Sequence, residues 1–361
     1  MAIELAREGF RAAPSHEERV YEAARLFGLG RNPANKSAQA VLFEAFTTDD
    51  FPTLLASAFT NQAVQAQQTA EREFEDLLVD VASMDFEPRQ LVDMWSGDEF
   101  EEVGQGEEYP MGTLDTMSNI WHRARKHGKQ YGLTWELRLR NEFNQLANFP
   151  RFLGNGSIKG QNTAVAKLLV DDEGAWNTNV FNSVSNLPLT PENLQTAIDE
   201  LGTRTNHRDE LIDTSNLVLL HGPALRSVVN NILLTDELEM TAPGSEDGTT
   251  TVTRIDNPYR NIVTPLESRS LGKRLDNARG WALMQRNTSD LPSIVRTYIP
   301  GQEQVDIRVK RDQGMYVTGG DVPVEQGSFN DDTIWFRGRD VWGIDAGFTE
   351  GVWASTGGSG K

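Results

Sequence analysis

The chain has 361 residues, 34 Lys and Arg against 53 Asp and Glu, a formal net charge of −19, and no cysteine. The lack of cysteine excludes disulfides, thiolate zinc sites, iron–sulfur clusters and a cysteine nucleophile. The acidic balance argues against wrapping nucleic acid, because affinity for phosphate comes from Lys and Arg. No apolar run approaches the roughly 18 residues of a membrane helix, and the N-terminus lacks the basic and apolar segments of a secretory signal. The length predicts two or three domains or one elongated domain.

The first 60 residues predict a helical arm. Residues 15–18 have the spacing of a capping box, and apolar residues recur behind them at helical period. A second helix is expected near Asp50, with Pro52 just inside its first turn. The arm is short of core residues, so we expect it to pack on another surface.

Charge changes sign along the next segment. Residues 71–108 hold fourteen carboxylates against two arginines, and residues 122–129 then hold His, Arg and Lys without any acid. A stretch rich in glycine and turn-forming residues, VGQGEEYPMGTLD, lies between the two runs. The pattern predicts a long hairpin or looped-out excursion with an acidic outgoing limb and a basic returning limb. A solvated charged loop is the alternative, and the segment taken alone favours it.

Helices and strands alternate along the rest of the chain. Residues 131–172 predict one long helix, broken or kinked near Pro150 and the glycines of GNGSIKG. Thr190 and Pro191 begin a second helix that Gly202 ends, and a buried strand at 216–220 leads into a third helix. This order predicts an α/β or α+β core. Further strands are expected at residues 261–263, 281–284, 293–298, 305–309, 333–337 and 339–343.

Motifs for catalysis and metal binding are sparse. No two histidines form H-E-x-x-H, and His122 and His127 lie in a basic run that repels cations. The glycines of GNGSIKG have the wrong spacing for a dinucleotide loop, and the acid pairs lack the spacing of a calcium loop. His221, after a buried strand, is the best-placed catalytic candidate, but no Ser or Asp partner can be argued for it, so a structural histidine is the preferred interpretation. We therefore predict no catalytic, cofactor or metal site and no enzymatic activity.

Three motifs, and the order in which they occur, make this chain similar to a known protein family. LTPENLQTAIDELG is followed by NLVLLHGPALRSVV, and the chain closes on TIWFRGRDVWGIDAGFTEGVWAS, in which Arg339 stands four residues before Gly343. With the arm and the charged excursion in front of them, these motifs resemble the major capsid proteins of tailed phages. The resemblance implies an α+β, Hong Kong 97-like capsid fold with an N-arm, an E-loop, a spine helix, a peripheral (P) domain and an axial (A) domain.

The resemblance also assigns parts and partners. It implies an N-terminal arm (1–70), the lead-in to the P-domain and the E-loop hairpin (71–130), the spine helix and P-domain (131–214), the A-domain (215–302), P-domain strands (303–353) and a flexible tail (354–361). Pentamers and hexamers of identical subunits would form an icosahedral shell around packaged double-stranded DNA, assembled in the cytoplasm of a bacterial host. Portal and scaffold proteins are implied as partners, with a decoration protein as a further option and no membrane.

Twelve charged residues are the candidates for contacts between subunits. They are Asp98, Glu99, Glu101, Glu102, Glu107, Glu108, Arg123, Arg125, Lys126, Lys129, Arg337 and Arg339. Opposite charges on two limbs would let copies dock head to tail around a ring. Our specific hypothesis is that the acids of residues 99–108 pair across subunits with Arg123, Arg125 and Lys126.

The chain departs from the family pattern in two respects, and two other functions remain as alternatives. Some relatives crosslink an E-loop Lys to an Asn, but residues 90–122 contain no Lys, so Asn330 is not expected to serve as an acceptor. Some relatives carry a long N-terminal scaffolding segment, whereas here a separate scaffold protein or none is expected. The alternatives are an encapsulin-like shell that encloses cargo enzyme, and a soluble α/β enzyme with its site near His221.

Overall fold

A computed structural model describes eight segments of the chain. They are residues 51–92, 102–109, 117–134, 143–206, 209–242, 251–289, 291–322 and 327–358. The arm expected at residues 1–50 lies outside them. The described residues fall into two compact units, which are treated separately. Unit 1 draws on the segments Met1–Glu71, Lys126–Lys159 and Gly301–Val341, and unit 2 on Arg72–Arg125, Gly160–Pro300 and Trp342–Lys361.

Two helices contribute to unit 1. Helix α4 (Phe51–Thr69) begins beside Asp50 with Pro52 in its first turn, as the sequence predicts. Helix α6 (Phe143–Leu169), whose residues up to 159 belong to this unit, is continuous through both Pro150 and GNGSIKG. Of the two expected outcomes, a break or a kink, the break is wrong. A Cβ at Gly154 would lie 2.2 Å from the carbonyl oxygen of Ala63. This glycine therefore permits close contact with α4 instead of ending the helix.

Three strands form the sheet of unit 1. Strand β4 (Arg125–Leu133) and strand β12 (Asp306–Val309) both pair with the part of β13 (Ile334–Ala346) that lies in this unit. The expected helix from residue 131 is thus wrong at its start, because residues up to 133 belong to β4. The two strands expected at 333–337 and 339–343 are one continuous strand. Gly338 does not interrupt it; a Cβ there would lie 2.8 Å from the Leu153 side chain of α6.

A five-stranded sheet organises unit 2, in the order β5-β14-β10-β6-β9. Its strands are β5 (Val184–Ser185), β14 (Trp353–Ser355), β10 (Trp281–Gln285), β6 (Leu217–His221) and β9 (Thr264–Glu267). Every residue of β6 and β10 is buried, which explains their uninterrupted apolar sequence. The strand expected at 261–263 is wrong and lies at β9, since Asn261 has a left-handed φ of 55° that suits a turn.

Helices cover both faces of this sheet. Leu217 and Leu219 share a core with α7 (Pro191–Gly202) and α8 (Arg226–Leu233), while Val218 and Leu220 share one with the end of α6 and with α9 (Arg269–Arg274). The Thr190 hydroxyl accepts a hydrogen bond from the Asn193 amide at 3.2 Å, which confirms the predicted cap of α7. The short 3-10 turn η2 (Pro223–Leu225) leads from β6 into α8. The expected α+β architecture is confirmed.

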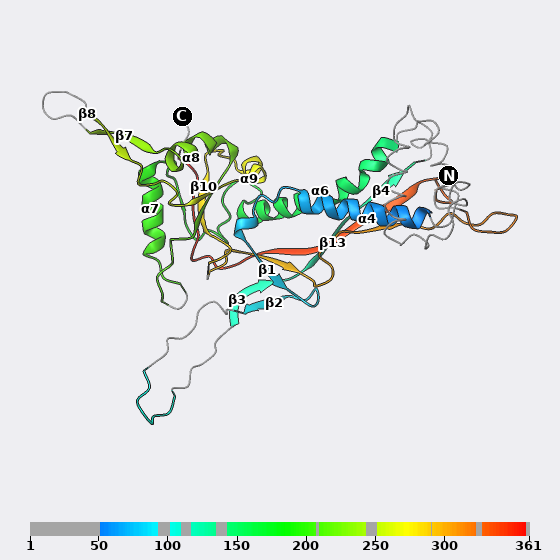
Figure 1. Cartoon of the computed structure of the whole chain (residues 1–361), viewed down its shortest axis with the longest axis horizontal. Coiled ribbons are helices and arrows are strands. Elements are labelled where there is room, and N and C mark those ends of the chain that lie inside the picture. Colours follow the sequence, from blue (N-terminus) through cyan, green and yellow to red (C-terminus); the bar gives the residue numbers. More distant parts are fainter. Residues whose placement is uncertain are drawn as a thin grey trace, which may run out of the picture. The chain divides into compact units, whose positions relative to one another are not determined.

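The remaining elements of unit 2 include one hairpin that the sequence did not predict. Strands β7 (Glu237–Ala242) and β8 (Thr251–Asp256) pair in antiparallel register (Figure 1). Strand β1 (Leu78–Ala82), which follows the 3-10 turn η1 (Glu75–Leu77), pairs in parallel with β11 (Ile294–Tyr298), and β11 pairs with the last residues of β13. In the expected flexible tail, the Asn277 side chain donates to the carbonyls of Thr356 and Gly358 at 2.6 and 3.0 Å.

Candidate functional site

The charged excursion has an ordered root in unit 2. Strand β2 (Arg89–Val92) pairs in antiparallel register with β3 (Met117–His122), so the chain leaves and returns on neighbouring strands (Figure 1). This confirms the predicted hairpin at its root. The stretches 93–101 and 110–116 lie outside the described residues, and with them the candidates Asp98, Glu99 and Glu101.

An apolar cluster fixes this root to the rest of unit 2. Leu91 of β2 and Ile120 of β3 pack with Val295 of β11 and Phe348, and Leu91 and Val295 are almost fully buried. Burial of a side chain of this size stabilises a fold by about 1.5–3 kcal/mol. The root is therefore part of the folded unit.

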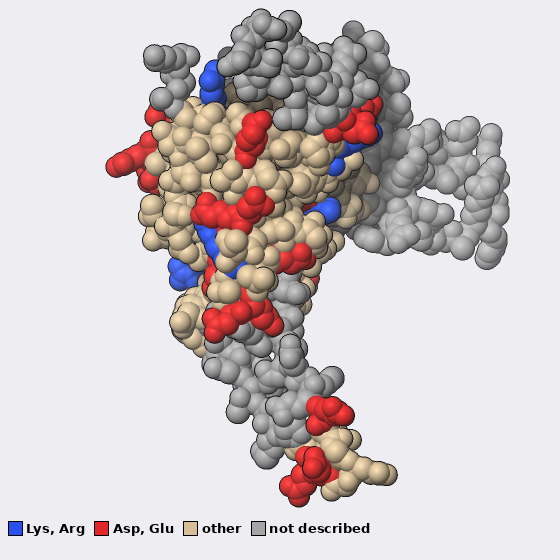
Figure 2. Space-filling model, turned by 90° about the vertical axis from the view of Figure 1, so that its left-hand side faces the viewer, with Lys and Arg blue, Asp and Glu red and all other residues tan. Residues whose placement is uncertain are grey.

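The described segment 102–109 presents its acids to solvent. Glu102, Glu107 and Glu108 are exposed, and Tyr109 keeps 84% of its surface accessible. The Glu107 amide donates to the Gly104 carbonyl at 3.0 Å, and the Glu107 carboxylate accepts from the Gly104 amide at 3.2 Å. These two bonds define a local turn, which we call the acidic turn (residues 102–109). Figure 2 shows acidic and basic side chains scattered over the described face, and acidic ones alone on the described part of the protruding tip.

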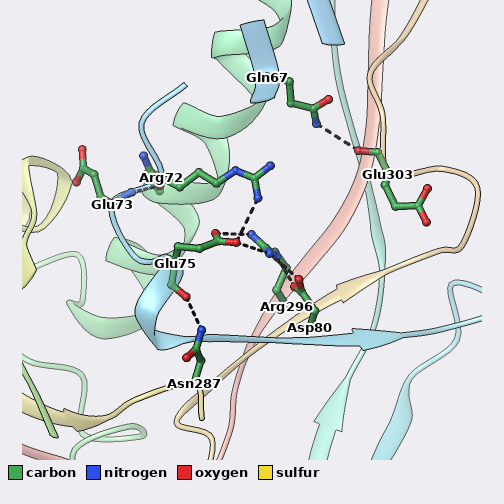
Figure 3. Close-up of polar contacts among 9 residues, drawn as sticks. Gln67, Arg72, Glu73, Glu75, Asp80, Asn287, Arg296 and Glu303 are labelled. Carbon is green, nitrogen blue, oxygen red and sulfur yellow. Dashed lines mark hydrogen bonds and ion pairs between the residues drawn. The ribbon is translucent and has the colours of Figure 1, made fainter. Parts of the chain in front are cut away.

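The beginning of the acidic run is not part of a solvated limb. Glu75 and Asp80 each bind the guanidinium of Arg296 through two contacts, at 2.9 and 3.0 Å for Glu75 and at 2.5 and 2.7 Å for Asp80 (Figure 3). Burial alone would lower the pKa of Arg296, but these two carboxylates outweigh it and raise that pKa above its ordinary value. Asp76 pairs with Arg286 at 3.1 Å. The expectation of a single acidic limb from residue 71 is therefore wrong, because these acids hold β1 to β11.

Glu73, another acid of this run, also binds groups within its own chain. Its carboxylate is largely buried and accepts hydrogen bonds from the Ser268 hydroxyl at 2.6 Å and the Ser270 amide at 2.9 Å, at the start of α9. An acid placed there satisfies amide groups that the helix leaves unpaired. Only the separation of these partners by almost 200 residues hid this role from sequence reasoning.

On the returning limb, Arg125 is bound within its own chain. Its guanidinium makes two contacts with the Asp345 carboxylate, at 2.6 and 3.1 Å, and the Arg123 amide also donates to Asp345 at 3.1 Å. A Cβ at Gly343 would lie 1.8 Å from the Arg123 carbonyl oxygen, so β13 accepts the returning chain only because residue 343 is glycine. Asp345 and Gly343 together fix the point where β3 leads into β4.

The other basic candidates differ in their surroundings. Arg339 pairs with Asp306 at 2.9 Å, and the Lys129 ammonium lies 5.6 Å from the centre of the Tyr131 ring. Arg123, Lys126 and Arg337 are exposed, and the structure shows no ion pair between their side chains and any other described residue. Pairing between subunits through these twelve residues stays a prediction.

His122 adds a testable pH dependence at the root. Its ring is buried, and its Nδ1 lies 3.0 Å from the Thr297 hydroxyl. Burial lowers its pKa; Asp345 acts in the opposite direction and Arg89 adds to the lowering. Because the unfolded chain then binds protons more tightly, the free energy of unfolding should fall as pH drops below about 6.5. Urea unfolding between about pH 7.5 and 5.5 should show a weaker decline for His122→Gln. Equal declines in both proteins would contradict this assignment.

His221 occupies a structural position. It is almost fully buried at the end of β6, and its Nδ1 lies 2.9 Å from the Gly222 carbonyl oxygen. Burial lowers its pKa. The carboxylate of the neighbouring Glu267 is bound by Arg226 at 2.5 and 2.6 Å. These contacts are those of a satisfied core histidine, the interpretation that the sequence favoured.

The described residues show neither a cluster of metal ligands nor a membrane-spanning helix. No group of three or more metal-ligating side chains is placed to hold an ion in the segments that the structure covers. No helix within those segments is long and apolar enough to cross a membrane.

Comparisons with known proteins give one family match. The family model described as phage capsid protein matches residues 120–355, more than half of the chain. No curated protein sequence matches the chain. Among solved structures, the chain is similar to a virus-like particle from Pyrococcus furiosus, with 8% identity, a TM-score of 0.44, and coverage of 82% of this chain and 97% of that one. It is also similar to a capsid of Cyanophage P-SCSP1u, with 10% identity, a TM-score of 0.44, and coverage of 80% of this chain and 89% of that one. A SrpI encapsulin complex from Synechococcus elongatus PCC 7942 has 10% identity, a TM-score of 0.42, and coverage of 81% of this chain and 89% of that one.

Proposed function

The chain belongs to the phage capsid protein family, and from that premise we propose that its copies assemble as pentamers and hexamers into an icosahedral shell around double-stranded DNA. The protein is a structural protein of the capsid with the Hong Kong 97-like fold that the sequence predicted. Members of this family build shells and are not enzymes, which agrees with the structural position of His221.

One observation supports the assembly proposal more than any other. The hairpin root is locked into the core of unit 2, whereas the acidic turn that it carries exposes three carboxylates and an aromatic ring. A monomer gains nothing from holding such a segment away from its own core, since exposed Tyr109 forgoes the free energy of burial. A neighbouring copy would supply the missing surface, and many such modest contacts would add up in a closed shell.

The parts of the family fold can be assigned on this basis. We assign β2, β3 and the acidic turn to the E-loop, α6 to the spine helix, and the five-stranded sheet with α7 and α8 to the A-domain. This A-domain includes α7, β5 and β14, which lie outside the range 215–302 expected from the sequence. The sheet of β4, β12 and β13 belongs to the P-domain in this assignment. Portal and scaffold proteins, and optionally a decoration protein, are the proposed partners, and assembly is proposed to occur in the cytoplasm of a bacterial host before the shell becomes the virion capsid.

Electron microscopy and sedimentation of the purified protein, alone and with its scaffold, test the proposal. We expect rings or shells of megadalton size, far larger than the 40.2 kDa chain. Shells recovered from infected cells should contain DNA; shells that contain a protein cargo instead would favour the encapsulin alternative. A preparation that stays monomeric under all these conditions would contradict the proposal.

A further inference from the structure

The root of the hairpin, β2 and β3, is attached to unit 2 mainly through its side chains. The two strands pair with each other in a sheet of two strands. A hairpin of two strands is marginally stable at best in water. Its position therefore depends on the apolar cluster around Leu91 and on polar contacts at the end of β3.

His122 makes one of these polar contacts. Its side chain is only 4% exposed, and its Nδ1 lies 3.0 Å from the hydroxyl of Thr297, which is fully buried. Thr297 lies inside a larger sheet, since it is paired with Val81 of β1 on one side and with Gly343 of β13 on the other. The contact between His122 and Thr297 thus joins the hairpin root to the middle of a folded sheet.

The charged groups near the ring give a proton on it little support. Arg89 of β2 is directly opposite His122, and its own partner is Asp85, at 2.6 Å. From β13, the charge of Asp345 acts on the ring in the opposite direction to that of Arg89. However, the Asp345 carboxylate is already bound by the guanidinium of Arg125 at 2.6 and 3.1 Å.

The neighbours of Thr297 on β11 point away from the ring. Arg296 and Tyr298 flank Thr297, and successive side chains of a strand point to opposite faces. The guanidinium of Arg296 is bound by Glu75 and Asp80. Among the described residues, no ion pair joins His122 to a carboxylate, so an imidazolium there would be a buried cation without a partner of its own.

We propose that His122 is a proton switch that releases the root of the hairpin from β11 in acid. The neutral ring needs only its hydrogen bond with Thr297 and can stay buried. An imidazolium, formed by taking a proton from the solvent, must reach water or an anion. Either the ring leaves its site, or Asp345 turns from Arg125 toward it. Both changes loosen residues 122–125.

The release is local and differs from a general loss of stability. Elements with few contacts to the rest of a fold open more readily than its core. The pKa of His122 is lowered by burial in the closed root, and it returns to its ordinary value of about 6.5 when the ring reaches water. The open root therefore binds the proton more tightly, and the free energy of opening falls as pH drops below about 6.5.

Amide hydrogen exchange of the purified chain, followed at low concentrations of urea, tests the switch. Protection factors, which correct for the intrinsic effect of pH on exchange, are compared at about pH 7.5 and 5.5. Protection of β2 and β3 in the wild-type protein should fall roughly three- to tenfold over this range, because one proton changes the equilibrium by at most about tenfold per pH unit. Exchange of the root should depend little on urea, since local opening exposes little surface.

Three variants isolate the histidine. His122→Gln keeps an amide that can bond to the Thr297 hydroxyl but takes up no proton, so its root should be equally protected at both pH values. His221→Gln is the matched control: His221 is also buried with a lowered pKa, but it lies in β6, between β10 and β9, so the root should keep the wild-type response. Thr297→Val removes the hydrogen bond and keeps His122, so the root should open more at neutral pH and still respond to acid.

Three results would overturn the proposal. The first is equal protection of the wild-type root at both pH values, and the second is an equally large fall in His122→Gln. The third is a root whose protection and urea dependence match those of β6 and β10, which would show that only the whole unit opens.

In a shell, the release would free the acidic turn that the root carries, and this consequence alone rests on the proposed function. Wild-type shells brought to about pH 5.5 should lose protection at β2 and β3 and release subunits faster in sedimentation than His122→Gln shells. Identical responses of the two kinds of shell would overturn a role of the switch in the assembly. A wild-type chain that never assembles would count against the proposed function, whereas the exchange results on the single chain would still decide the switch.

Discussion

Replacing Gly343 with alanine should destabilise the protein by about 3 kcal/mol, the upper end of the usual cost of overpacking. The added Cβ would lie 1.8 Å from the carbonyl oxygen of Arg123, 2.9 Å from its carbonyl carbon and 3.4 Å from the Cα of Ala124. All three are backbone atoms, which cannot move aside as the end of a flexible side chain can. On its other edge, residue 343 is paired with Thr297 of β11. Relief therefore requires β3 and β4 to separate from β13.

Urea unfolding of Gly343→Ala against the wild-type protein measures this effect. Gly156→Ala is the matched control, because nothing lies within 4 Å of a Cβ at that helical position. Alanine there should be neutral or stabilise the fold by roughly 0.5–1 kcal/mol. The explanation fails if both variants unfold at the same urea concentration. Because residue 343 positions the root of the hairpin, folded Gly343→Ala protein should also assemble poorly.

Replacing Arg296 with methionine should cost about 3 kcal/mol, the lower end of the range for breaking a buried ion pair. The side chain of Arg296 is only 11% exposed, and it holds Glu75 and Asp80 simultaneously (Figure 3). Methionine keeps a stem of comparable length but leaves two neighbouring carboxylates without their shared cation. These carboxylates are about half exposed, so water partly compensates and the upper end of the range is not expected.

Lysine at position 296 should recover only part of the loss, because an ammonium cannot form two paired contacts with two carboxylates. Arg89→Met provides the control, since its pair with Asp85 lies at an exposed surface and should matter little. Chemical unfolding of the three variants gives the comparison. Equal stability of Arg296→Met and Arg89→Met would show that the contacts in Figure 3 do not hold β1 to β11.

The sequence indicated where the charged hairpin lies but not which residues its charged side chains contact. The change of charge sign and the turn-rich stretch between the two runs indicated either a hairpin or a solvated loop, and β2 and β3 confirm a hairpin at its root. The same pattern could not show that Glu75 and Asp80 form ion pairs with Arg296, or that Arg125 forms one with Asp345. Each of these pairs joins residues more than 200 positions apart, so composition along the chain carries no signal of the pairing.

The sequence by itself determined the features that depend on near neighbours. Thr190 and Pro191 start α7, the apolar spacing along it selects its buried face, and the uninterrupted apolar runs give β6 and β10. The order of such segments was also sufficient to identify the family. Only the tertiary structure decided what the glycines and the charges do. Gly154 and Gly338 stood at expected interruptions and Gly343 at the expected end of a strand, but each lies within a continuous helix or strand at a point of close approach. A glycine that ends an element and one that admits a neighbour look alike until distant segments come together.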